Sequence, residues 1–219
     1  MTAALTIRTL GEVAYAPAVA AMQRFTTERN ADTADEIWLL EHPPVFTLGT
    51  NAANEHVLDA GSVPVVQTDR GGQVTWHGPG QLVVYLLLDL KRLKLSVKSL
   101  VHGMEAAVIA MLHDYGIEAR CEAGAPGVYV DGDKIASLGV RVKRGRCYHG
   151  LAVNVSNDPD AFSGINPCGY QGLKTLRISD LADPADTAEV ATKLLPHLLR
   201  ELQLEGAEVT NSQSEWQPV

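Results

Sequence analysis

The sequence predicts an α/β protein in which a mixed β-sheet packs against flanking helices. Helix-like and strand-like segments alternate in the first half of the 219 residues, and hairpin signals follow in the second half. Hairpins bring antiparallel neighbours into the sheet, which disfavours a simple doubly wound parallel sheet. Hydrophobic residues make up 46% of the chain and no linker divides it, so we expect a single domain over residues 1–219.

Apolar periodicity predicts the elements of the first half. Apolar residues three apart predict a helix in residues 16–29. Three apolar runs predict strands: residues 36–40, 45–48 and 81–90. The last run is nearly continuous, which is typical of a strand buried on both faces. Residues 99–115 have helical spacing, and Gly116 follows where a C-terminal cap belongs.

A hairpin opens the second half. Asp131 and Gly132 supply the positive φ angles of a tight turn between residues 128–130 and residues 135–142. Residues 147–155 have the pattern of a further strand, which we expect to pair with this hairpin. The second half therefore predicts three antiparallel strands in succession.

The carboxy-terminal region is predicted to be helical and then poorly ordered. Residues 188–204 have a helical pattern, which Pro196 should kink or divide because proline cannot donate the helix hydrogen bond. Residues 205–219 have no clear apolar pattern, and we expect a weakly ordered tail.

Composition narrows the class of function. Lysine and arginine total 18 and aspartate and glutamate total 26, a formal net charge of −8 that argues against a nucleic-acid binder. The three cysteines form no CxxC pair and no disulfide framework, which fits a reducing compartment. The amino-terminal residues lack a signal-peptide pattern, and no apolar run reaches the roughly 20 residues of a membrane span. We expect a soluble cytoplasmic protein that does not contact membranes.

Three segments contain residues that could carry chemistry. Residues 70–81 include four glycines, which let the backbone approach a ligand and present N–H groups to an oxyanion. Lys134 begins a strand after the tight turn, and Cys168 lies between Pro167 and Gly169 on a stiff turn. Each segment also has an ordinary structural interpretation: a glycine-rich turn, a solvated lysine and a buried cysteine.

Lys134 and Cys168 are more informative together. The thiolate is the reactive form of cysteine, and a nearby ammonium stabilises it by Coulomb attraction. Such a pair would provide an activated nucleophile. Cys121 and Cys147 lack a comparable turn and are predicted to be structural. The seven histidines show no metal-binding spacing, so we expect no metal.

These segments together resemble the lipoyl(octanoyl) transferase family. The likeness rests on five motifs in the family's order: EHPPVFTLG at residues 41–49, RGGQVTWHGPGQ at 70–81, GVYVDGDKIASLGVRV at 127–142, HGLAVNV at 149–155 and NPCG at 166–169. Each motif alone is only modestly specific for the family, whereas the ordered set of motifs is highly specific. The resemblance extends from about Glu36 to Leu181, most of the chain.

The resemblance implies the fold shared by biotin and lipoate protein ligases. It implies transfer of an octanoyl group from octanoyl-acyl carrier protein to a lysine of a lipoyl domain, either in the E2 subunits of 2-oxoacid dehydrogenases or in the glycine cleavage H protein. It also implies that Cys168 is the nucleophile and Lys134 its partner. The positions matching the segments that line the acyl site are Arg70, Gly71, Gly72, Gln73, Val74, Thr75, Trp76, His77, Ser137, Leu138, Gly139, Gly150, Leu151 and Ala152.

A two-step mechanism follows from this resemblance and from the chemistry of thioesters. Cys168 would take the acyl group from the carrier and pass it to the acceptor lysine, with Lys134 handling the proton. We expect oxyanion donors near Gly72, His77 or Gly169. A thioester is already activated, so no cofactor is expected. His77 and His149 are possible accessory bases, although a lone histidine is more often a structural hydrogen-bonding group.

Two basic clusters are candidates for docking an acidic carrier protein. One comprises Lys91, Arg92, Lys94 and Lys98, and the other comprises Arg141, Lys143, Arg144 and Arg146. An ordinary solvated edge is an equally good interpretation of either cluster.

Three rival functions remain open from the residues alone. An ATP-dependent lipoate–protein ligase would need a nucleotide site but not Cys168. A cysteine hydrolase would need a histidine base beside the nucleophile. A catalytically inactive carrier-binding protein would need neither a nucleotide site nor a histidine base. The combination of Lys134 with Cys168 favours the transferase.

Overall fold

The computed structural model describes residues 4–184 and 186–213. Its largest feature is an eight-stranded mixed sheet with the spatial order β11-β1-β2-β6-β10-β9-β8-β7. The bounds of these strands, in that order, are Glu208–Gln213, Ala4–Glu12, Asp35–Glu41, Gln81–Leu87, Arg146–Asn154, Asp133–Lys143, Ala125–Val130 and Arg120–Glu122. Neighbours from β2 to β7 pair antiparallel, whereas β1 runs parallel to β2 and to β11. The predicted mixed sheet is therefore confirmed.

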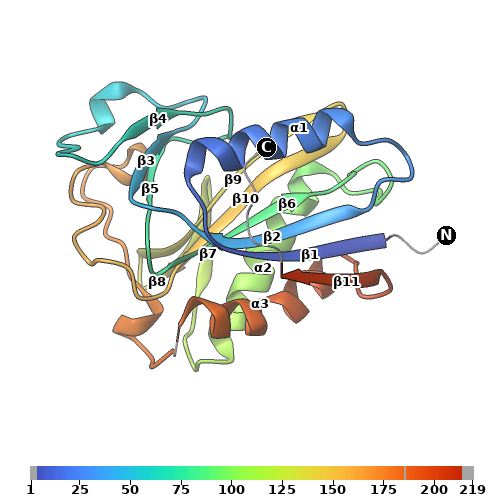
Figure 1. Cartoon of the computed structure of the whole chain (residues 1–219). Coiled ribbons are helices and arrows are strands. Elements are labelled where there is room, and N and C mark those ends of the chain that lie inside the picture. The colour runs from blue at the N-terminus through green and yellow to red at the C-terminus, as the bar shows by residue number, and fades with distance from the viewer. Residues whose placement is uncertain (1–3, 185, 214–219) are drawn as a thin grey trace.

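Helices cover both faces of this sheet, as Figure 1 shows. Helix α1 (Tyr15–Glu28) lies on one face, and α2 (Val97–His113) and α3 (Thr187–Glu201) lie on the other. Strand β6 explains this arrangement, because successive side chains of a strand point to opposite faces. Its residues Leu82, Val84 and Leu86 pack with α2 and α3, whereas the residues between them pack with α1.

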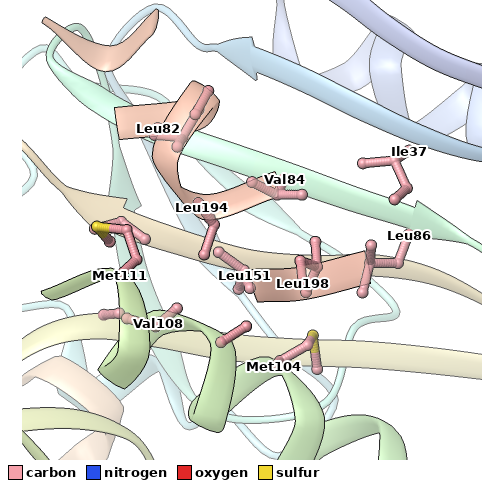
Figure 2. Close-up of a cluster of buried hydrophobic side chains, with 14 of the residues drawn as sticks. Ile37, Leu82, Val84, Leu86, Met104, Val108, Met111, Leu151, Leu194 and Leu198 are labelled. Atoms are coloured by element: carbon pink, nitrogen blue, oxygen red, sulfur yellow. The ribbon is translucent and has the colours of Figure 1, made fainter. Parts of the chain in front are cut away.

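The larger core lies between the sheet and the helix pair α2–α3. Figure 2 shows Met104, Val108 and Met111 of α2 facing Leu194 and Leu198 of α3, with the apolar side chains of the sheet beside them. Strand β6, which passes over this core, is buried on both faces, and its sequence is therefore a nearly continuous apolar run.

A second, three-stranded sheet lies on the same side of the large sheet as α1. It consists of β4 (Val65–Gln67), β3 (Val45–Leu48) and β5 (Val74–His77), in that order. Its own small core includes Phe46, Trp76 and Phe162. This sheet and the glycine-rich segment that precedes β5 form the outer wall of the cavity described below.

The predicted elements agree closely with these bounds. The two helices and three strands expected in the first half are present, and β3 has the predicted limits. Gly116 follows α2 with a φ of +73°. The hairpin of β8 and β9 turns at Asp131 and Gly132, both with positive φ, and β10 pairs with it as expected.

Two expectations for the carboxy-terminal region need correction. Helix α3 is a single element that includes Pro196, so the proline does not divide it. Proline has no N–H to donate to the carbonyl of Thr192, four residues earlier, but Thr192 and Pro196 are both exposed, so this carbonyl can bond to water instead. The tail expected to be weakly ordered contains β11, which pairs with β1; the last residues, 214–219, lie outside the described residues. The mostly polar side chains of β11 give no apolar signal, because main-chain hydrogen bonds to β1 define the strand.

None of the helices in the described part of the chain has both the length and the apolar character needed to cross a bilayer.

Candidate active site

The structure brings Lys134 and Cys168 together. Lys134 is the second residue of β9, and Cys168 is the middle residue of a short 3₁₀ turn, Pro167–Gly169. The ammonium nitrogen of Lys134 lies 2.8 Å from Sγ of Cys168. Lys134 is only 2% exposed, so this contact is largely shielded from solvent. The two residues that the sequence analysis combined into one candidate pair are thus joined by a direct hydrogen bond.

Three groups surround the buried ammonium of Lys134. It donates hydrogen bonds to Sγ of Cys168 and to the carbonyl oxygen of Pro126, at 3.1 Å, and lies 5.1 Å from the ring centroid of Tyr129. Burial, the largest single influence, lowers the pKa of Lys134, but the charges and hydrogen bonds of Cys168 and Tyr129 together outweigh burial and raise it. The charged form of Lys134 is therefore supported by Cys168 and Tyr129 together.

Main-chain hydrogen bonds hold the cysteine turn over Lys134. The N–H of Lys134 donates to the carbonyl of Lys174, and the N–H of Leu176 donates to the carbonyl of Lys134, both at 2.9 Å. The chain that leaves Cys168 is thus tied directly to β9. Cys168 itself has a φ of +56°, a conformation that non-glycine residues rarely adopt.

A cavity of about 440 Å³ opens beside this pair. It lies between the small sheet with its glycine-rich segment and the face of the large sheet that carries α1. Thirteen of the fourteen residues predicted to line the acyl site line it: Arg70, Gly71, Gly72, Gln73, Val74, Thr75, His77, Ser137, Leu138, Gly139, Gly150, Leu151 and Ala152. Trp76 is the exception, because β5 turns its side chain away to pack edge-on against Phe162.

Arg70 supports the glycine-rich segment from within. Its guanidinium donates to the carbonyl and the hydroxyl of Thr47, at 2.6 Å and 2.8 Å, and to the carbonyl of Gly71. The N–H of Gly71 donates to the carbonyl of Val140, which joins the segment to β9. Burial lowers the pKa of Arg70. The side chain holds the segment in place and brings a cationic group to the cavity wall.

The two histidines predicted as accessory bases are both engaged in hydrogen bonds. Nδ1 of His77 donates to Oε1 of Gln81 at 2.7 Å, and Nε2 of His149 donates to Oδ1 of Asp69 at 2.9 Å. Burial lowers the pKa of His77 well below its usual value and lowers that of His149. The hydrogen bond from His149 holds the pKa of Asp69 below its usual range. Both histidines line the cavity.

Several cavity residues have no signal in the sequence. Tyr15 comes from the start of α1, Tyr85 from β6, and Asn51 from the segment after β3. His42 lies behind Tyr85, whose hydroxyl donates to Nε2 of His42 at 2.7 Å. These side chains meet only because the large and small sheets pack against each other, so no local pattern marks them.

The two predicted basic clusters form one surface. The N–H of Leu90 donates to the carbonyl of Gly145, and the stem of Lys91 packs on Gly145 at the turn between β9 and β10. This turn lies at the opposite end of β9 from Lys134, about 30 Å away at the usual rise of a strand. Docking of a carrier on this surface stays a prediction.

Within the described ranges, no group of three or more histidine, cysteine, aspartate or glutamate side chains is arranged to hold a metal ion.

Sequence comparisons identify relatives along most of the chain. A family model described as the lipoyl protein ligase A/B catalytic domain matches residues 14–199. The octanoyltransferase of Methylococcus capsulatus is 57% identical over 199 residues, which cover 91% of this chain and 96% of that protein. The octanoyltransferase of Azoarcus sp. is 59% identical over 198 residues, which cover 90% of this chain and 87% of that protein.

Solved structures share the fold at much lower identity. A putative lipoate protein ligase from T. acidophilum has a TM-score of 0.77 and 16% identity, and the match covers 99% of this chain and 90% of that one. The biotin protein ligase of Aquifex aeolicus has a TM-score of 0.54 and 15% identity, with coverage of 93% and 70%. These likenesses confirm the predicted fold.

The sequence relatives are close enough and cover enough of the chain to establish its family. This chain belongs to the lipoyl protein ligase A/B catalytic-domain family and, within it, to the octanoyltransferases.

Proposed function

We propose that this enzyme transfers an octanoyl group from octanoyl-acyl carrier protein to a lysine of a lipoyl domain through a thioester on Cys168. The acceptors would be the E2 subunits of 2-oxoacid dehydrogenases and the glycine cleavage H protein. The observation that carries this proposal is the 2.8 Å contact between the buried ammonium of Lys134 and Sγ of Cys168 at the edge of the cavity. The octanoyltransferase relatives support the choice of acyl group.

In the first half-reaction, the thiolate of Cys168 attacks the carbonyl carbon of the carrier thioester. The negative charge then moves to the carbonyl oxygen, which needs hydrogen-bond donors. The N–H of Gly72 is suited to this role, because Gly72 lines the cavity and its N–H makes no hydrogen bond within the described part of the chain. The bond to the carrier sulfur breaks, and the departing thiolate takes a proton from Lys134.

Lys134 is then well placed for the second half-reaction. Once Cys168 carries the acyl group, its negative charge no longer raises the pKa of Lys134, and burial, which lowers this pKa, is opposed only by the weaker effect of Tyr129. Neutral Lys134 can therefore accept a proton from the attacking amine. The new amide bond forms, the bond from carbon to Sγ breaks, and the thiolate–ammonium pair is restored.

The cavity wall supports an alkyl chain as the acyl group. Val83 and Ala152, whose apolar side chains belong to the α1 face of the large sheet, line it together with the side-chain-free surfaces of the glycines. Burial of each methylene contributes about 0.8 kcal/mol, so the length of the apolar space influences which chain binds best.

The proposed location is the cytoplasm. Cys168 must stay reduced to act as a nucleophile, and all three cysteines are free thiols. A reducing compartment preserves such thiols.

Intact-protein mass spectrometry tests the proposal directly. The enzyme is mixed with octanoyl-acyl carrier protein in the absence of ATP, beside the variants Cys168→Ala and Cys121→Ala. We expect an octanoyl adduct on the wild type and on Cys121→Ala, no adduct on Cys168→Ala, and loss of the adduct on addition of a lipoyl domain. Transfer that requires ATP and survives in Cys168→Ala would instead establish a ligase.

A further inference from the structure

A buried acceptor without a partner lies beside the nucleophile. Gln73 lines the cavity, and its Oε1 is buried without a hydrogen bond to any other described residue. Its side chain packs on Gly169: Cδ and Cγ lie 3.3 Å and 3.4 Å from the point where a Cβ of residue 169 would be. Buried polar atoms are normally paired, so an unpaired acceptor in a cavity wall is a place where a ligand can supply the missing donor.

An imidazole reaches the same point. Nε2 of His56 lies 3.2 Å from the Cβ position of residue 169. The main chain of His56 is fixed to the cysteine turn, because its carbonyl accepts from the N–H of Asn166 at 2.8 Å. The ring makes no hydrogen bond to any residue in the described ranges, unlike the rings of His77 and His149. The carboxamide and the imidazole thus converge on the residue that follows Cys168.

The second half-reaction requires one more proton acceptor than the Lys134–Cys168 pair provides. The acceptor lysine arrives as an ammonium with three hydrogens, and the amide product retains one of them. Cys168 departs as a thiolate, so Lys134 takes one of the two released protons and the other has no recipient in that pair. Histidine is the side chain suited to take it near neutral pH.

We propose that Gln73 and His56 form the reception site for the acceptor lysine: Oε1 of Gln73 accepts a hydrogen bond from the ammonium, and Nε2 of His56 takes its first proton. The free amine then attacks the thioester, and Lys134 takes the second proton. This inference rests on the proposed function, because it concerns the acyl-enzyme formed on Cys168.

Separate measurement of the two half-reactions tests the role of His56. Acylation is followed by mass spectrometry with octanoyl-acyl carrier protein alone, and discharge is followed after a lipoyl domain is added to the isolated acyl-enzyme. In His56→Gln we expect acylation at the wild-type rate and discharge slowed by about tenfold to a thousandfold, partly restored by added imidazole. The control is His113→Gln, an exposed histidine on α2, which should match the wild type in both steps.

The variant Gln73→Met tests the hydrogen bond, because methionine fills a similar volume without an acceptor oxygen. We expect a raised half-saturation concentration of lipoyl domain in discharge, and a larger effect on discharge than on acylation. Slower acylation in His56→Gln, or equal slowing of both steps in Gln73→Met, would place the contact on the carrier arm and overturn the inference. Unchanged discharge, or slowed discharge that imidazole does not restore in His56→Gln, would also overturn it. If the wild type forms no adduct, the proposed function itself fails.

Discussion

Gly127 leaves the space that the side chain of Lys134 occupies. A Cβ on Gly127 would lie 2.5 Å from Cε of Lys134 and 2.8 Å from the carbonyl oxygen of Ala136, closer than real Cβ atoms approach, and 3.0 Å from Nζ of Lys134. Gly127 also has a φ of +143°, which side chains disfavour. Lys134 reaches Cys168 only because residue 127 has no side chain.

The substitution Gly127→Ala is therefore expected to displace Lys134 from Cys168. We expect formation of the acyl-enzyme to fall by at least about tenfold, the effect of losing about 1.4 kcal/mol of thiolate stabilisation. The rate is measured as adduct formation on Cys168 by mass spectrometry. Gly116→Ala is the matched control, since Gly116 has a φ of +73° and open space around its Cβ position. It should cost about 1 kcal/mol of stability with unchanged acylation; equal acylation rates in both variants would contradict the steric argument.

Lys134→Met removes the ammonium while nearly preserving the volume of the side chain. Because the thiolate of Cys168 then loses its hydrogen-bonded counter-charge, we expect alkylation of Cys168 by iodoacetamide at neutral pH to slow by about tenfold or more. The modified residue is identified by peptide mass spectrometry. Lys174→Met, an exposed lysine nearby, should alkylate at the wild-type rate. Full reactivity in Lys134→Met would mean that other groups stabilise the thiolate.

A buried ion pair at the far end of the sheet is expected to be important for stability. Nη2 of Arg29 lies 2.6 Å from Oδ1 of Asp35, and both side chains are 1% exposed. Arg29→Met would leave a buried carboxylate with less compensation, and we expect a loss of about 3–5 kcal/mol in the free energy of unfolding. Denaturant unfolding measures it. Arg24→Met removes an exposed pair at 3.9 Å and should cost less than about 1 kcal/mol; similar losses in the two variants would contradict the role of burial.

The sequence predicts elements well where their own side chains specify them. The buried strand β6 and helix α2 have strong apolar patterns, and the turn at Asp131 and Gly132 has the residues that its backbone angles require. Strand β11 was not predicted, because its order comes from main-chain pairing with β1 rather than from apolar side chains.

The candidate site is predictable only in part, for the same physical reason. Lys134 and Cys168 are separated by 34 positions, and their contact results from the main-chain pairing of Lys134 with residues 174–176. The motif containing Trp76 contributes to the cavity wall, but strand alternation turns the side chains of Val74 and Trp76 into the core behind it. Motifs identify the segments of the site, whereas the packing of the two sheets decides which side chains face it.

Buried neutral histidines should make the protein sensitive to acid, and His42 provides the clearest test. Nε2 of His42 accepts a hydrogen bond from Tyr85, and burial lowers the pKa of His42 to about 4. In the unfolded chain a histidine has a pKa of about 6.5. Between these values the unfolded state binds a proton that the folded state does not. Stability is therefore complete above about pH 6.5 and falls with pH, by up to about 3 kcal/mol at pH 4.

The variant His42→Asn isolates this contribution. It should be less stable than the wild type at pH 7, because it loses packing and changes the partner of Tyr85, but its stability should fall less steeply between pH 6.5 and pH 4. Urea unfolding at a series of pH values measures both curves. His113→Gln, which alters an exposed histidine, should retain the wild-type slope. Parallel curves for His42→Asn and the wild type would show that His42 is protonated as readily in the folded protein as in the unfolded chain.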